Sequence, residues 1–224
     1  MKPFKTIILA AGEGSRMKSK KPKVLHKIFN EPMINYVIKA ATECGSEKLC
    51  VVIGHKAEEV QQAIAQKDIT FALQKQQLGT GHAVMQAMDF LEEDKNILIL
   101  YGDTPLITVE SLKELISFHE VENNDVSIVS AIVEDPTGYG HIIRDEQGNF
   151  LKNIEHKDAS ESEKTVQEIN TGIYYFKGSA LKEALVKLTN DNAQGEYYLP
   201  DTLSILLQSG YRVNALVTKD APAY

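Results

Sequence analysis

The sequence of 224 residues contains no tryptophan, only two cysteines and no long apolar run. Cys44 and Cys50 do not have the spacing of metal ligands, so we expect both thiols to be reduced and buried. The longest apolar runs are far too short for a helix that crosses a membrane. The run that begins at Thr6 is also too short for a secretory signal. We therefore expect a cytoplasmic protein.

A broad excess of positive charge is also missing. Acidic residues number 31 and basic residues 24, so the formal net charge is -7 at pH 7. Nucleic-acid binding usually needs a basic face, so we expect neither a nucleic acid nor a membrane as partner. The composition, with 43% hydrophobic and 25% charged residues, is that of an ordinary globular protein.

Short apolar runs alternate with helical patterns along the first half of the chain. Buried strands are predicted at residues 6–10, 48–54, 69–73 and 96–102, and helices at 34–44, 56–66 and 81–91. Continuous apolar strands separated by helices indicate a mostly parallel sheet with helices on both faces. The predicted fold class is therefore α/β, with a Rossmann-like central sheet.

The pattern changes after residue 110. Strands are predicted at 126–135 and 172–178, a hairpin at 140–156 with its turn at 146–149, and helices at 180–188 and 199–208. We expect one domain, 1–224, with a nucleotide-binding half (1–110) and a mixed half (111–224). Ligands of such sheets bind at the carboxyl ends of the strands. Three glycine-containing segments fall at such ends, namely 11–16, 78–82 and 102–105.

A glycine loop followed by basic residues stands out at the N-terminal end. Gly12 and Gly14 end the first strand, and six basic residues follow within residues 16–27. The loop is not a Walker A motif, and Met17 occupies the third glycine position of a dinucleotide fingerprint. Backbone N–H groups of such a loop can hold an anion, and clustered cations suit a triphosphate. The alternative is a solvated charged loop without a ligand.

Several motifs together resemble one enzyme family. "LAAGEGSRM" with "KPKVLHK" is similar to the signature of sugar-phosphate nucleotidyltransferases. The resemblance continues through "LQKQQLGTGHA", "LYGDTPL", "DPTGYGHI", "IEHKDA", "INTGIYYF" and "NAQGEYYLPD". Taken together, these segments resemble the N-terminal uridyltransferase half of the bacterial bifunctional enzymes that make UDP-N-acetylglucosamine. The resemblance implies UTP and N-acetylglucosamine 1-phosphate as substrates and Mg²⁺ as cofactor.

The resemblance also implies a nucleotide site in the first half. Arg16, Lys23 and Asp103 correspond to the catalytic residues, and Asp103 to the metal ligand. Preorganised cations would stabilise the charge that develops when the α-phosphorus is attacked. The implied nucleotide-binding residues are Leu9, Ala10, Ala11, Gly12, Gly14, Lys23, Gln74, Gly79, Thr80, Tyr101, Gly102 and Asp103. The remaining lysines of the loop, Lys18, Lys20 and Lys21, are interpreted as solvated.

Two of these assignments have structural alternatives. The amide of Gln74 can both donate and accept, which suits the imide edge of uracil. The same segment also reads as a plain helix N-terminus with Thr80 as its cap. Asp103 could hold a divalent cation, since Mg²⁺ prefers one or two carboxylates with phosphate oxygens and water. It could equally cap the turn that follows.

The second half is implied to bind the sugar phosphate. Gly140, Glu155 and Asn170 correspond to residues that contact the sugar, although each would look like an ordinary hairpin or loop residue without the resemblance. Tyr198 is implied to line the acetamide pocket. Pro200 departs from the family's pattern, where a threonine is common.

A further departure concerns the end of the chain. The family's Gly-Val-Asn segment, whose asparagine completes the metal site, is missing, and so is the β-helix acetyltransferase domain. We therefore expect a truncated fragment that binds metal more weakly and is largely monomeric, whereas the full-length parent would be a homotrimer. Two alternatives stay open, namely a nucleotidyltransferase for another base or sugar, and a nucleotide-binding module without turnover.

Overall fold

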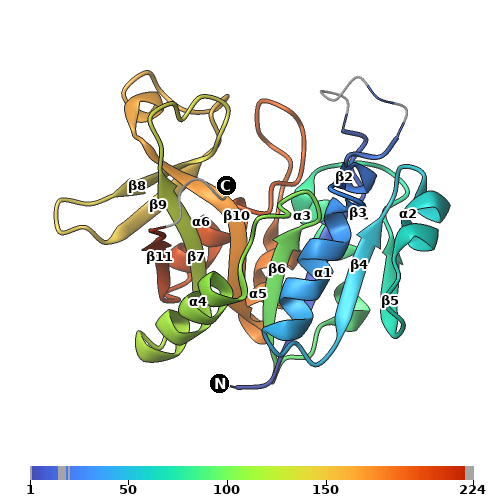
Figure 1. Cartoon of the computed structure of the whole chain (residues 1–224). Helices are drawn as coiled ribbons and strands as arrows, with labels where there is room; N and C mark the ends of the chain where they lie inside the picture. The colour runs from blue at the N-terminus through green and yellow to red at the C-terminus, as the bar shows by residue number, and fades with distance from the viewer. Residues whose placement is uncertain (1, 15–18, 20, 220–224) are drawn as a thin grey trace.

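A mixed sheet with helices on both faces organises the chain in the computed structural model, which describes residues 2–14, 19 and 21–219 (Figure 1). Within these residues the main sheet has nine strands. They are β1 (Phe4–Ala10), β4 (Leu49–Ile53), β5 (Ile69–Leu73), β6 (Asn96–Tyr101), β7 (Val126–Ile132), β8 (His141–Arg144), β9 (Phe150–Ile154), β10 (Glu168–Lys177) and β11 (Val213–Val217). The helices are α1 (Met33–Glu43), α2 (Ala57–Ala63), α3 (Thr80–Met85), α4 (Val109–Val121), α5 (Gly178–Lys187) and α6 (Asp201–Gln208). A small hairpin, β2 (Lys27–Ile28) and β3 (Glu31–Pro32), projects beside α1.

The sheet is parallel in its first half and mixed in its second. Its strand order is β11-β7-β10-β6-β1-β4-β5, with β8 and β9 attached to β10. β1 is central and fully buried, and it pairs in parallel with β4 and β6. β10 runs antiparallel to both β6 and β7. The predicted α/β class and the change of character after residue 110 are therefore confirmed.

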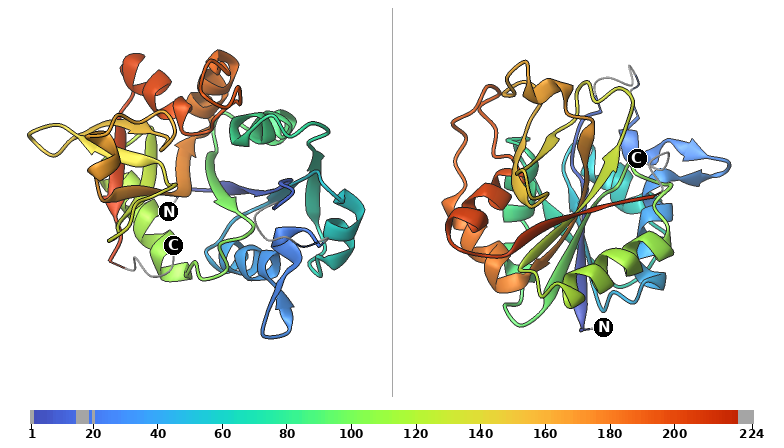
Figure 2. Two further views of the ribbon diagram at one scale, coloured as in Figure 1. Left: turned by 90° about the horizontal axis from the view of Figure 1, so that it is seen from above. Right: turned by 90° about the vertical axis from the view of Figure 1, so that its left-hand side faces the viewer.

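Two hydrophobic cores lie on opposite faces of the sheet. The view from above shows the helices that cover these two faces (Figure 2). Alternating residues of β1 point to opposite faces, so Ile7 belongs to one core and Ile8 to the other. The first core packs against α3, α5 and α6, and the second against α1, α2 and α4. This packing fixes the carboxyl ends of β1 and β6, where the parallel strands open onto the top of the molecule in Figure 1.

Several elements differ from the sequence prediction. The helix predicted at 81–91 is split into α3 and a 3₁₀ turn at Met88–Phe90, because Ala87 leaves helical geometry while the apolar side chains around it stay in the core. Helix α4 and strand β11 were not predicted. α4 has a buried face that begins at Leu112 and an N-cap at Thr108, whose side chain accepts a hydrogen bond from the Ser111 N–H.

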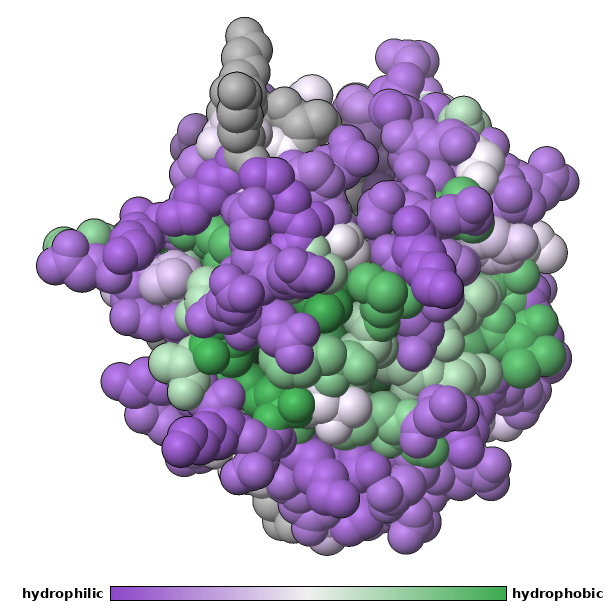
Figure 3. Space-filling view, turned by 90° about the vertical axis from the view of Figure 1, so that its right-hand side faces the viewer, coloured by the Kyte–Doolittle hydropathy of each residue, from purple (hydrophilic) through white to green (hydrophobic). Residues whose placement is uncertain are grey.

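The β5 edge of the described sheet carries exposed apolar side chains. Figure 3 looks at the β5 edge and shows apolar side chains gathered across the middle of that face, with hydrophilic ones around them. Leu73 of β5 is 48% exposed there.

Among the described residues no helix is long and apolar enough to cross a bilayer.

Candidate nucleotide-binding site

A cavity of about 540 Å³ opens where β1 and β6 end. Its walls are Leu9, Ala10, Ala11, Gly12, Gly14, Lys23, Val24, Gln74, Gln77, Gly79, Thr80, Ala83, Tyr101, Asp103 and Glu196. The structure thus brings the predicted nucleotide-binding residues to one place, apart from Gly102. The Gly102 N–H donates to the Leu9 carbonyl at 2.9 Å and so ties the end of β6 to β1. Arg16 lies outside the described residues.

The glycine loop is held against Lys23. The Ala11 carbonyl accepts a hydrogen bond from the His55 N–H at 3.0 Å, which fixes the start of the loop. Gly14 has a φ of +65°, and a Cβ atom built there would lie 2.7 Å from the Cβ of Lys23. A side chain at this position would therefore separate the loop from Lys23. The second glycine is needed for this close approach as well as for its backbone angle.

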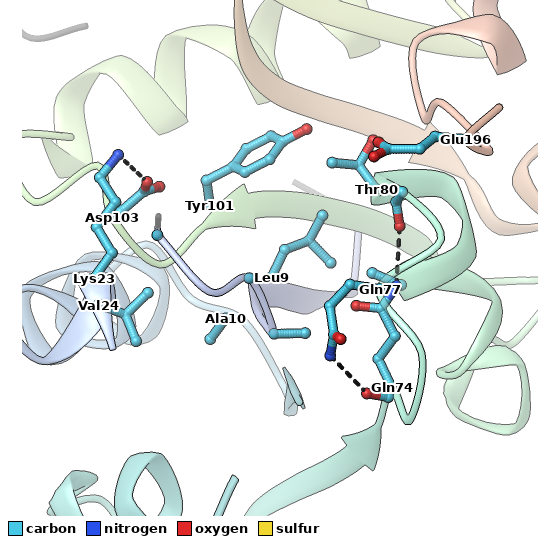
Figure 4. Close-up of a pocket in the computed structure, with 15 residues that line it drawn as sticks. Leu9, Ala10, Lys23, Val24, Gln74, Gln77, Thr80, Tyr101, Asp103 and Glu196 are labelled. Atoms are coloured by element: carbon cyan, nitrogen blue, oxygen red, sulfur yellow. Dashed lines mark hydrogen bonds and ion pairs between the residues drawn. The ribbon is translucent and has the colours of Figure 1, made fainter. Parts of the chain in front are cut away.

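Lys23 and Asp103 form an ion pair at one end of the cavity (Figure 4). Lys23 Nζ lies 2.5 Å from Asp103 Oδ2, and the two side chains are 43% and 25% exposed. The Asp103 carboxylate thus faces a cation rather than a backbone N–H, so the capping alternative is wrong. Within the described residues no group of three or more His, Cys, Asp or Glu side chains could hold a metal ion. A single accessible carboxylate nevertheless fits Mg²⁺, which takes most of its ligands from phosphate and water.

Gln74 is buried at the other end, and its amide is already partly committed. Its side-chain N–H groups face the Gly79 carbonyl at 3.0 Å and Nδ1 of His82 at 3.1 Å. No described group donates a hydrogen bond to Gln74 Oε1. The sequence prediction treated this amide as both donor and acceptor toward a ligand. In the structure only its oxygen, Oε1, is available to a ligand, as an acceptor.

The turn at residues 78–81 is clamped by a loop from the second half of the chain. The Tyr197 N–H donates to the Leu78 carbonyl at 2.8 Å, and the Gly81 N–H donates to the Tyr197 carbonyl at 2.7 Å. The Thr80 hydroxyl accepts from the Leu199 N–H at 3.0 Å. The N-cap of α3 is Gly79, without a side-chain cap, so the alternative that Thr80 caps this helix is wrong.

Four cavity residues were not found from the sequence, namely Val24, Gln77, Ala83 and Glu196. Gln77 lies inside the quoted segment "LQKQQLGTGHA", and its amide donates to the Gln74 carbonyl at 3.2 Å. Glu196 lies inside the quoted segment "NAQGEYYLPD", but far along the chain from the other lining residues. Glu196 reaches the cavity because residues 197–199 are hydrogen-bonded to residues 78–81, and no local sequence pattern predicts that contact.

Gly140, Glu155 and Asn170 gather around the β8–β9 hairpin and do not line this cavity. The Asn170 N–H donates to the Gly140 carbonyl at 2.8 Å. The Asn170 amide donates to Asn153 Oδ1 at 3.1 Å and to the Tyr174 hydroxyl at 2.9 Å. A Cβ atom at Gly140 would lie 2.9 Å from Glu155 Oε1. These residues therefore form one compact polar group.

The carboxylates near this group are electrostatically coupled. Burial raises the pKa of Glu155, and the negative charge of Asp201 raises it further. Burial and then Asp158 raise the pKa of Asp201 to about 6. Tyr198 lies among them, with its hydroxyl accepting from Gln194 Nε2 at 2.6 Å. The pKa of the Tyr101 hydroxyl at the cavity wall is also raised, mainly by burial and in small part by the negative charge of Glu155.

Asp201 should make stability depend on pH. Its pKa in the folded state lies above its ordinary value of 3.8, so the folded protein binds this proton more tightly than the unfolded chain. The free energy of unfolding should therefore fall as pH rises from about 4 to about 6. Because Asp201 is partly exposed, solvent screens part of this effect. We expect Asp201→Asn to raise the free energy of unfolding by about 1 kcal/mol at pH 8 and to leave it unchanged at pH 4.

Urea denaturation at both pH values measures this effect. Asp191→Asn, at an exposed position, is the matched control and should change neither value. An equal gain from Asp201→Asn at pH 4 and pH 8 would show that the titration of Asp201 is not the cause.

The sequence profile described as "Nucleotidyl transferase" matches residues 5–221. "Bifunctional protein GlmU" of Thermoanaerobacter pseudethanolicus is 53% identical over 215 residues, which is 96% of this chain and 47% of that protein. The protein of the same name from Clostridioides difficile is 47% identical over 212 residues, with 95% and 46% covered. The chain spans about half the length of the curated relatives it matches.

A solved structure shares the fold. The crystal structure of UDP-glucose pyrophosphorylase complexed with UDP-glucose superimposes with a TM-score of 0.79 over 97% of this chain and 91% of that chain. The two sequences are 20% identical, so this likeness concerns the architecture alone. The profile match and the two relatives named GlmU confirm the family resemblance that the motifs indicated.

Proposed function

Because the chain belongs to the nucleotidyl transferase family, we propose that it transfers a uridylyl group from UTP to N-acetylglucosamine 1-phosphate, giving UDP-N-acetylglucosamine and pyrophosphate. Residues 1–110 bind the nucleotide, and residues 111–224 bind the sugar phosphate through Gly140, Glu155, Asn170 and Tyr198. The partners are small molecules in the cytoplasm. We propose that this chain is monomeric in solution.

The observation that carries the proposal is the polarity of one cavity. A cation, Lys23, lies beside the glycine loop at one end, and an uncommitted amide oxygen, that of Gln74, lies at the other (Figure 4). A nucleoside triphosphate has the matching polarity, with phosphates at one end and a base edge at the other. Uracil carries a hydrogen on N3, which Gln74 Oε1 accepts, whereas N3 of cytosine is an acceptor.

The reaction needs positioning and charge stabilisation rather than a covalent intermediate. The sugar phosphate oxygen is already an anion and attacks the α-phosphorus in line, while pyrophosphate leaves. Backbone groups of Leu9, Ala10, Ala11 and Gly12 hold the nucleotide, and the cations Arg16 and Lys23 stabilise negative charge on the phosphates. The polar group around Glu155 orients the sugar through its hydroxyls.

A divalent cation fits the Asp103 end of the cavity. Asp103 would hold Mg²⁺, and when bound the metal would screen charge on the phosphate oxygens. The same carboxylate forms an ion pair with Lys23. Binding of a triphosphate gives Lys23 a second anionic partner, so the ion pair can open without leaving either charge uncompensated.

Pyrophosphate release tests the proposal. The full chain is assayed with UTP, N-acetylglucosamine 1-phosphate and Mg²⁺, and with CTP, dTTP or glucose 1-phosphate as replacements. We expect release confined to UTP with N-acetylglucosamine 1-phosphate. Preference for another pair would assign a different nucleotidyltransferase activity, and nucleotide binding without release would indicate a binding module.

Gln74 should determine the choice of base. Since its Oε1 accepts from uracil N3–H, we expect Gln74→Ala to lower the ratio of kcat/KM for UTP over CTP about tenfold. The control is Gln76→Ala, an exposed glutamine two residues away that does not line the cavity. An unchanged ratio in Gln74→Ala would remove this side chain from base recognition.

A further inference from the structure

Glu196 places a carboxylate in the cavity that the steps above do not use. It lines the cavity together with Gly79 and Thr80. Figure 4 shows its side chain directed toward Thr80, at the end away from Lys23 and Asp103. Among the described residues, no hydrogen bond or ion pair to this carboxylate is found, so its oxygens remain available as acceptors.

The backbone around Glu196 is fixed on both sides. Its N–H donates to Asn192 Oδ1 at 3.2 Å, and its carbonyl accepts from Asn192 Nδ2 at 2.6 Å. The next residue, Tyr197, is hydrogen-bonded to Leu78 and Gly81. Glu196 is therefore held at the cavity wall by contacts that leave the side chain uncommitted, as a ligand-binding group requires.

Charge limits what this carboxylate can contact. An ionised carboxylate only accepts hydrogen bonds and, without a cation beside it, repels phosphate. The triphosphate therefore belongs at the other end, where Lys23 pairs with the Asp103 carboxylate. The remaining parts of a nucleotide are the base, whose edge faces Gln74, and the ribose. Both ribose hydroxyls are donors, and two carboxylate oxygens can accept from them.

We propose that Glu196 binds the ribose hydroxyls and makes the site select ribonucleotides over deoxyribonucleotides. This inference rests on the proposed function, since it assumes a nucleotide in the cavity. The sugar-phosphate hydroxyls are a less suitable partner, because Gly140, Glu155 and Asn170 do not line this cavity. Glu196 is thus a specificity-determining residue at the nucleoside end.

The test compares UTP with 2′-deoxy-UTP and 3′-deoxy-UTP in pyrophosphate release by the parent, Glu196→Gln and Glu196→Ala. We expect the parent to prefer UTP. Both variants should lower that preference, by about 10- to 100-fold for Glu196→Ala, mainly through a loss of kcat/KM on UTP. Asp191→Asn removes one negative charge from the same loop at an exposed position and should change nothing.

Two other results would overturn this assignment, and a third would move the test from catalysis to binding. If the Glu196 variants lose kcat/KM equally on UTP, 2′-deoxy-UTP and 3′-deoxy-UTP, the assignment of Glu196 to the ribose is wrong. A changed preference between N-acetylglucosamine 1-phosphate and glucose 1-phosphate, with the ribose preference intact, would overturn it by assigning Glu196 to the sugar phosphate. If the parent releases no pyrophosphate, the proposed function fails, and calorimetric binding of the same three nucleotides to parent and variants judges Glu196 by the same ratios.

Discussion

Asp103→Asn is expected to lower kcat for pyrophosphate release about 100- to 1,000-fold, because it removes the carboxylate that would hold the divalent cation while keeping the shape of the side chain. The Mg²⁺ concentration for half-maximal rate should rise at least tenfold. Stability should hardly change. The ion pair with Lys23 is partly exposed, and such pairs contribute about 0–1 kcal/mol.

A Mg²⁺ titration of the rate, with thermal unfolding alongside, separates this role from a purely structural one. Glu47→Gln is a matched control. It breaks the ion pair with Lys95, which is 2.8 Å long and has similar exposure but lies away from the cavity. The control should keep the parent's rate and metal dependence. If Asp103→Asn reaches the parent's rate at saturating Mg²⁺, Asp103 is not a metal ligand.

The parts of the fold that could be predicted are those governed by short-range patterns. β1 and β6 are buried on both faces, so each contains an uninterrupted apolar run, at residues 7–10 in β1 and 97–100 in β6, and this pattern indicates parallel neighbours. Helix α1 has a proline before it and Gly45 after it, with a φ of +100° at that glycine. The boundaries of α1 could therefore be read from local chemistry.

Elements that depend on distant partners could not be predicted in this way. Strand β11 is short and only partly buried, and it exists because β7 offers a parallel edge some eighty residues earlier in the chain. The prediction of one helix at 81–91 was wrong for a related reason. Its apolar side chains follow helical spacing, but the core accepts them from α3 and a separate 3₁₀ turn.

The candidate site also has features that follow from short-range sequence patterns and features that depend on distant contacts. The glycine loop, Gln74 and Asp103 each occur at the end of a predicted strand, so their convergence followed from the topology of a parallel sheet. The direction of the Gln74 amide, fixed by Gly79 and His82, could not be read from residue types. The same is true of Glu196, which reaches the cavity only through the backbone contacts of Tyr197.

Those backbone contacts make Gly79 the most sensitive position of the site. It has a φ of +105°, and a Cβ atom there would lie 2.5 Å from the Tyr197 carbonyl oxygen and 2.9 Å from its nitrogen. Both neighbours are backbone atoms, so no side-chain rotation can relieve the clash. We expect Gly79→Ala to lower the free energy of unfolding by about 3–5 kcal/mol, from backbone strain and overpacking together.

Gly210→Ala is the control that isolates the backbone term. Gly210 also has a positive φ, of +84°, but a Cβ atom there meets nothing within 4 Å, so a cost of about 1–2 kcal/mol is expected. Urea denaturation gives both values, and calorimetry with UTP should show that only Gly79→Ala weakens nucleotide binding, by tenfold or more, because the clamp positions Gln74 and Glu196 together. Equal costs for the two variants would mean that the loop moves away easily and that the clamp does not shape the cavity.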